Sequence, residues 1–153
     1  MTPFSPLQYL LDKARKARDH AGQTLAADRR NATQTASQLD VLLQYRAEYG
    51  SRLQEALHRG TDTLALDNYR RFIQSLDTAI EQARQALATQ QGRVSASQQQ
   101  WQHQQRTLSS YDTLISRRTR DAHQQTERQA RRQDDELSAG LFARRQQDNA
   151  TTD

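Results

Sequence analysis

The chain has 153 residues, of which 34% are hydrophobic and 6% aromatic, with a formal net charge of +4. This apolar fraction, below the roughly 45–50% of ordinary globular domains, excludes a thick core but suffices for a narrow seam between helices. There is no cysteine, which excludes disulfides and thiol chemistry, and we expect no signal peptide and no direct membrane insertion, since no apolar run approaches the roughly 18–20 residues of a span.

The first predicted element is a helix over about residues 5–58. The only prolines are Pro3 and Pro6, so Ser5 can cap a helix that has Pro6 as its first residue. Apolar residues recur at the a and d positions of a seven-residue repeat, the pattern of a coiled coil. Those of the first half are Phe4, Leu7, Leu11, Ala14, Ala21, Leu25, Ala32, Leu39, Leu42, Tyr49, Leu53 and Ala56.

A turn is predicted over residues 59–63, within the sequence HRGTDT. Gly60 can adopt the left-handed conformation that ends a helix, and the oxygens of Thr61, Asp62 and Thr63 can cap the next one. Because the connection is short, we expect the two helices to be antiparallel neighbours. The fold then pairs residues whose numbers sum to about 122.

The second predicted helix covers about residues 64–145, and a disordered tail covers about 146–153. Its a positions, none of them charged, run from Leu66 to Ala122 at every seventh residue, while Gln90, Ser97 and Gln104 occupy d positions and should loosen the middle of the seam. Beyond about residue 117 no partner remains in the first helix. The predicted fold is therefore all-α: residues 1–153 form a single long two-helix antiparallel coiled-coil hairpin with a C-terminal helical overhang.

No pattern of catalytic residues is recognisable in the chain. The four histidines show no i, i+4 pair of the kind a helical zinc site uses, and the acidic triplet DDE at 134–136 is typical of a solvated helix face. There is no glycine-rich phosphate loop. We therefore expect no catalytic residue, no metal site and no cofactor, and the chain is predicted not to be an enzyme.

Two basic clusters leave a nucleic-acid function open. KARKAR at 13–18 and ISRRTRD at 115–121 should lie near each other at the open end of the hairpin, where they could contact a phosphate backbone. Acidic neighbours such as Asp12, Asp19 and Asp121 balance them, and no aromatic-rich surface is present for base stacking. A basic rod associated with nucleic acid is thus a weaker alternative, and no nucleic acid is expected as a partner.

A second, partly aromatic row flanks the seam near the turn. Tyr45 and Phe72 are g positions, next to the d positions Tyr49 and Leu76. A two-stranded coil leaves g positions half exposed, so these rings either cover the seam or form a docking surface whose aromatic side chains anchor a partner.

The residues around these rows resemble the FliJ family of the bacterial flagellar type III export system. The resemblance covers about residues 38–87, and it rests on an LxxYxxEY pattern, a glycine-containing turn and a YxxFIxxL helix start. The residues that carry it are Leu42, Tyr45, Glu48, Tyr49, Tyr69, Phe72, Ile73 and Leu76.

The resemblance implies a coiled-coil stalk that inserts into the hexameric flagellar export ATPase and promotes its assembly and activity. It also implies coupling to the cytoplasmic domain of the export-gate protein FlhA, escort of export chaperones, and a cytoplasmic location peripheral to the inner membrane at the flagellar base. An alternative is a generic coiled-coil adaptor or chaperone of a related secretion system. By the resemblance, the gate-binding residues are Gln38, Leu42, Tyr45, Tyr49, Phe72, Leu76 and Ala79.

For the contact with the ATPase ring, the basic open end and an apolar patch of the overhang are the candidates. They are Lys13, Arg15, Lys16, Arg18, Arg117, Arg118, Leu137, Leu141 and Phe142.

Overall fold

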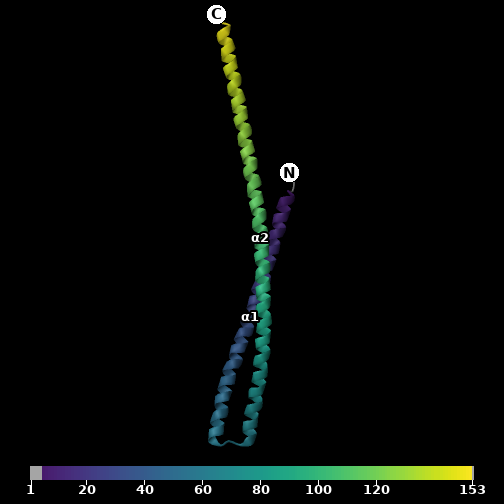
Figure 1. Ribbon diagram of the computed structural model, residues 1–153, viewed down its shortest axis with the longest axis vertical. Coiled ribbons are helices and arrows are strands. Elements are labelled where there is room, and N and C mark those ends of the chain that lie inside the picture. The colour runs from purple at the N-terminus through teal and green to yellow at the C-terminus, as the bar shows by residue number, and fades with distance from the viewer. Residues whose placement is uncertain (1–4, 153) are drawn as a thin grey trace. The chain divides into compact units, whose positions relative to one another are not determined.

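The computed structural model describes residues 5–152, and it confirms an all-α hairpin of two long helices packed against each other (Figure 1). Helix α1 spans Pro6–Arg59 and helix α2 spans Thr63–Ala150. Phe4, which the repeat places in the seam, lies outside the described residues.

Helix α2 extends past residue 145, where the sequence analysis ends the helix and begins a disordered tail. Hydroxyl groups bind its last carbonyls: Thr151 Oγ1 donates to the carbonyl oxygen of Gln147 and Thr152 Oγ1 to that of Asp148, both at 2.7 Å. The Gln147 carbonyl also accepts from the Thr151 amide at 3.2 Å, so two of the last four carbonyl groups of the helix have partners. The last turn of α2 therefore reaches Ala150.

The turn has the hydrogen bonds of a Schellman motif. The Thr61 amide donates to the Ala56 carbonyl at 3.2 Å and the Gly60 amide to the Leu57 carbonyl at 3.4 Å. Gly60 has a φ of 70°, in the left-handed region that glycine adopts without a Cβ clash. The Thr61 hydroxyl donates to the same Ala56 carbonyl at 2.9 Å. As the sequence predicts, glycine ends α1 and reverses the chain.

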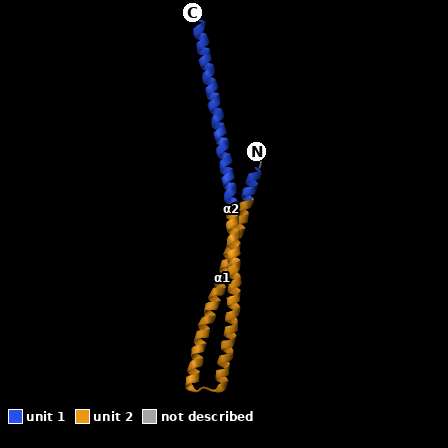
Figure 2. Cartoon of the chain, viewed as in Figure 1, with its two compact units in different colours: residues 1–12, 107–153 blue, residues 13–106 orange. Residues whose placement is uncertain are grey.

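The described chain divides into two compact units (Figure 2). Unit 1 combines the start of α1, up to Asp12, with α2 from Thr107 onward, and unit 2 comprises Lys13–Arg106. In unit 1, Leu11 and Leu108 are both buried. All of residues 116–150 are exposed, so this part of α2 is a solvated single helix and forms the C-terminal overhang that the sequence predicts beyond about residue 117.

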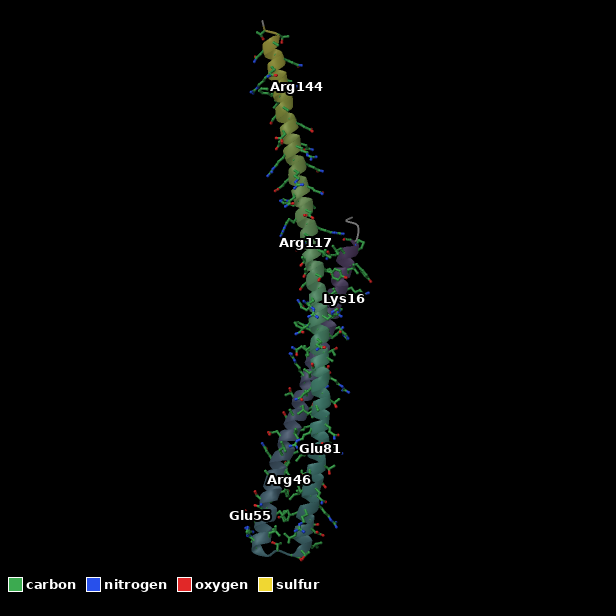
Figure 3. The ribbon with its side chains drawn as sticks, in the orientation of Figure 1. Lys16, Arg46, Glu55, Glu81, Arg117 and Arg144 are labelled. Carbon is green, nitrogen blue, oxygen red and sulfur yellow. The ribbon has the colours of Figure 1, made fainter. Side chains whose placement is uncertain are left out.

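The core of unit 2 follows the predicted seam. Its buried residues are all a or d positions: Ala14, Ala21, Leu25, Ala56, Ile73, Leu76 and Ile80. Arg46 Nε donates to Asp77 Oδ1 at 2.7 Å across the two helices, near the label of Arg46 in Figure 3. A Cβ added at Gly22 would lie 3.4 Å from the Trp101 ring. Both pairs agree with the predicted register to within about one residue.

The middle of unit 2 has a polar seam. The Ser97 hydroxyl donates to Asp28 Oδ2 between the helices, and the buried Oε1 of Gln90 has no hydrogen-bond partner among the described residues. Polar atoms at seam positions contribute less to stability than apolar ones, because they must be paired to offset their loss of hydration. The hairpin is therefore held mainly by the apolar layers on either side of this segment. In the part of the chain that the structure describes, neither helix has a stretch both long and apolar enough to cross a membrane.

Candidate functional site

Three aromatic rings meet between the helices close to the turn. The centroid of Tyr49 lies 4.4 Å from that of Phe72 and 6.4 Å from that of Tyr69, with interplanar angles of 57° and 53°. Tilted rings at such distances attract each other beyond the burial of their area. The guanidinium carbon of Arg52 lies 5.0 Å from the centroid of Tyr49, within the range of a cation–π contact. This cluster fixes Tyr49 and Phe72 in place.

Part of this aromatic surface faces solvent. Tyr45 is 48% exposed and Phe72 is 42% exposed, as expected for g positions, which flank the seam of a two-stranded coil without entering it. A shallow hollow opens beside the cluster, lined by Tyr49, Ala65, Asn68, Tyr69 and Phe72. A second hollow on α1, next to Tyr45, is lined by Gln34, Ser37, Gln38, Val41 and Leu42. The hairpin end thus offers apolar side chains beside hollows that could receive a partner's side chains.

The seven residues expected to bind the export gate differ in how much of their surface is exposed. Gln38, Tyr45 and Phe72 are exposed, whereas Leu42, Tyr49 and Ala79 are partly buried. Leu76 is only 7% exposed and belongs to the core. Leu76 therefore supports the surface from beneath and offers a partner little area. The contact between Tyr49 and Phe72 shows that the d and g positions of α1 near the turn and those of α2 join into one surface.

Tyr69, Arg52 and Val41 also belong to this region, although none of them is among the residues expected to bind the gate. Tyr69 occupies a d position of the repeat, and its ring joins the aromatic cluster. Arg52 lies three residues after Tyr49, a spacing that brings two side chains together on a helix, and this spacing could have indicated the contact. Val41 is 47% exposed and lines the hollow on α1.

The first basic cluster lies in unit 2, where Lys13, Arg15 and Lys16 are exposed. Lys16 is labelled in Figure 3, at the start of α1. The guanidinium of Arg18 is paired with its neighbour: Nη2 and Nε lie 2.9 Å and 3.1 Å from Asp19 Oδ1. A cation already paired with a carboxylate attracts an anionic partner less, so this cluster is a moderate anion site at most.

The other residues expected at the ATPase ring lie in unit 1. Arg117, labelled in Figure 3, and Arg118 are exposed. Leu137, Leu141 and Phe142 are 67%, 61% and 64% exposed. Three large apolar side chains this exposed on an otherwise polar helix are a feature of contact surfaces. Since the two basic clusters belong to different units, their meeting at an open end stays a prediction.

Nothing in this arrangement resembles a reaction centre. Between residues 5 and 152 no group of three or more histidine, cysteine, aspartate or glutamate side chains is placed to hold a metal ion. The hollows are shallow and lined by aromatic, aliphatic and amide side chains, which bind by contact and by hydrogen bonds. The surfaces are suited to recognition of other proteins.

Known proteins are similar to this chain in sequence over most of its length. The family model described as "Flagellar FliJ protein" matches residues 3–147. A flagellar FliJ protein of Salmonella typhi is 34% identical over 119 residues, which cover 78% of this chain and 81% of that relative. A flagellar FliJ protein of Escherichia coli strain K12 is 31% identical over the same length and shares. The chain therefore belongs to the flagellar FliJ family and is a non-catalytic component of flagellar protein export.

Proposed function

We propose that this protein is the coiled-coil stalk of the flagellar export ATPase. In this role it inserts into the hexameric ATPase ring, promotes ring assembly and activity, and couples the ring to the cytoplasmic domain of the export-gate protein FlhA. It also escorts export chaperones. It acts on the cytoplasmic side of the inner membrane at the flagellar base, associated with the membrane through these partners.

The observation that carries the proposal is the exposed aromatic surface near the turn. Tyr45 and Phe72 expose nearly half of their area, and the cluster around Tyr49 holds the surface rigid before any partner arrives. A preformed surface loses little conformational entropy on binding, so more of the contact energy appears as affinity. This surface coincides with the residues that the family resemblance assigns to the gate.

Contact with the ring is assigned to the overhang of α2 in unit 1. A helix that lies in a ring needs side chains on all of its faces available to the surrounding subunits. Residues 116–150 are all exposed and combine arginines with the apolar patch of Leu137, Leu141 and Phe142. Their mixed polar surface favours a contact that can rearrange during the ATPase cycle. Coupling between ring and gate then requires two sites on one molecule, each biasing its own partner.

The decisive experiment measures ATP hydrolysis by the purified export ATPase with and without this chain. Every residue from 121 to 152 is exposed, so we expect a form truncated after residue 120 to remain helical and hairpin-shaped but to stimulate hydrolysis no longer. Circular dichroism provides the control for folding. Full stimulation by the truncated form would show that the ring contact lies elsewhere, and no stimulation by the intact chain would favour a generic adaptor over a stalk.

A further inference from the structure

Over the middle of unit 2, one side of the hairpin is almost free of charge. In α1, the g positions from Ala17 to Tyr45 and the c positions between them carry no Asp, Glu, Lys or Arg. In α2, the corresponding positions between Asn68 and His103 carry one charge, that of Arg93. In an antiparallel pair the g positions of both helices flank the same side of the seam, as the contact between Tyr49 and Phe72 shows. We name this side the uncharged face.

Glu48 and Arg52, at the next c and g positions of α1, mark the end of this face, and within its ranges all charges but that of Arg93 lie at other positions of the helices. The e positions include Arg29, Arg70, Asp77 and Arg84, on the other side of the seam. Covering the uncharged face therefore removes few charged groups from water, which is the costly part of burying a polar surface. Within its ranges, Arg93 is the only charge that each copy brings to such a contact.

The uncharged face has a projection and a recess. Near the turn, Tyr45 and Phe72 project with 48% and 42% of their area exposed. Further along unit 2 a hollow spans both helices, and its lining includes the small residues Ala17, Ala21 and Ser97. From Ala21 to Tyr45 the distance along α1 is about 36 Å, at 1.5 Å per residue. Projection and recess thus lie on one face at a defined separation.

We propose that two copies of this protein associate through their uncharged faces, antiparallel to each other. In a twofold-symmetric interface, if a residue contacts a site on the partner, the partner's residue contacts the same site in return. An axis near residue 33 of α1 places the aromatic projection of each copy against the recess of the other. The four helices of the two copies then form an antiparallel bundle, a common arrangement for amphipathic helices.

The available area reaches the lower end of what specific interfaces bury. From Ala17 to Tyr45 the uncharged face follows about 42 Å of α1. With neighbouring helices about 8–10 Å apart, a strip about 15 Å wide gives roughly 600 Å² per copy. Specific protein interfaces bury about 600–1,000 Å² per partner. The face is therefore large enough for a second copy, whereas a single helix from another protein would cover only part of its width.

Dimerisation would have a regulatory consequence, which rests on the proposed gate contact. The aromatic projection that enters the recess is also the surface proposed to bind the export gate. A chain bound to its second copy could then not bind the gate, so free protein would be held in an inactive pair until the gate displaces one copy. The dimer itself does not depend on the identity of the gate-binding partner.

Sedimentation velocity of the full chain between about 1 and 200 µM tests the proposal. We expect a dimer at the upper concentrations. The variant Thr24→Glu with Ala86→Glu places two carboxylates per copy on the uncharged face. Its dimer dissociation constant should be roughly 100-fold higher than that of the wild type, because these charges would be buried without partners. The matched control, Thr33→Glu with Ala88→Glu, puts the same changes at exposed b positions off the face.

The two variants separate the possible results. A wild-type chain that stays monomeric at 200 µM overturns the proposal, and so does a control that dissociates as readily as the face variant. Circular dichroism of both variants excludes unfolding as the cause. A wild-type chain that dimerises, yet does not bind the gate domain at concentrations where it is monomeric, would contradict the proposed gate contact and leave the dimer proposal standing.

The orientation is tested by cross-linking, since the chain has no cysteine of its own. Thr24→Cys and Val41→Cys chains, which keep the Tyr45 projection, are mixed and treated with a short bismaleimide. Antiparallel pairing predicts links that join position 24 of one copy to position 41 of the other. Links that join only like positions would overturn the antiparallel arrangement.

Discussion

Removing the two exposed rings near the turn should weaken binding to the export gate and leave the hairpin folded. Tyr45 and Phe72 flank the seam, so neither belongs to the buried core of unit 2. We therefore expect Tyr45→Ala with Phe72→Ala to retain the helical circular dichroism of the wild type. The effect should appear in affinity for the cytoplasmic domain of the gate protein.

The magnitude follows from the exposed area of the two rings. An aromatic side chain has an area of about 200 Å², and Tyr45 and Phe72 expose 48% and 42% of theirs. Covering this area at about 25 cal/mol per Å² contributes roughly 2 kcal/mol for each ring. Since partial coverage is usual at an interface, we expect the double variant to bind the gate roughly 30- to 1,000-fold more weakly, with single variants losing about half of the free energy.

The assay is isothermal titration calorimetry with the purified gate domain. The control is Leu57→Ala with Leu64→Ala, which removes two leucines that are 49% and 68% exposed near the turn but occupy e and f positions. It should bind almost as tightly as the wild type. If the control lost affinity and the aromatic variant kept it, the gate would bind the tip of the hairpin and not the d/g surface, which would refute the reasoning.

The remaining predictions concern stability. Gly60→Ala should destabilise the hairpin by about 1 kcal/mol, because Gly60 has a φ of 70°. Gly92→Ala should stabilise it by about 0.5–1 kcal/mol, because a Cβ at Gly92 would have no atom within 4 Å. Thermal unfolding distinguishes these opposite signs. Leu76→Ala should cost about 2–4 kcal/mol, since Leu76 is 7% exposed, and an unchanged melting temperature would place it outside the core. Replacing Arg46 or Asp77 by alanine should cost under about 1 kcal/mol, because their ion pair is solvated, and this loss should shrink further at high salt.

The heptad repeat predicted most of the core. Leu11, Ala21, Leu25, Ile73 and Ile80 were all placed in the seam from spacing alone, and all are buried. The repeat works because helix geometry places every third or fourth residue on one face, whatever the rest of the chain does. The turn was predictable for a similar local reason, since Gly60 is the residue that best adopts the conformation it requires.

The candidate site was predictable in outline and less so in detail. The g positions of Tyr45 and Phe72 correctly indicated exposed rings, because exposure at g follows from the repeat. The repeat placed Leu76 in the seam, but its assignment to the gate surface did not foresee how little of its area a partner could reach, and the entry of Tyr69 into the aromatic cluster was not predicted. Both depend on the direction each side chain takes when a second helix lies against it, which spacing along one helix does not define.

The sequence by itself determined the two helices, the reversal at Gly60 and the register that pairs them, because each depends on local geometry and on a repeat running through the chain. Only the tertiary structure decided that Tyr49 packs on Phe72, that the ring of Tyr69 joins them, that α2 ends at Ala150 and that the chain divides into two units. These features depend on contacts between residues far apart in sequence and on how the last carbonyls find partners. The chain's own pattern therefore fixed where an aromatic surface could form, and the packing of α1 against α2 decided which side chains compose it.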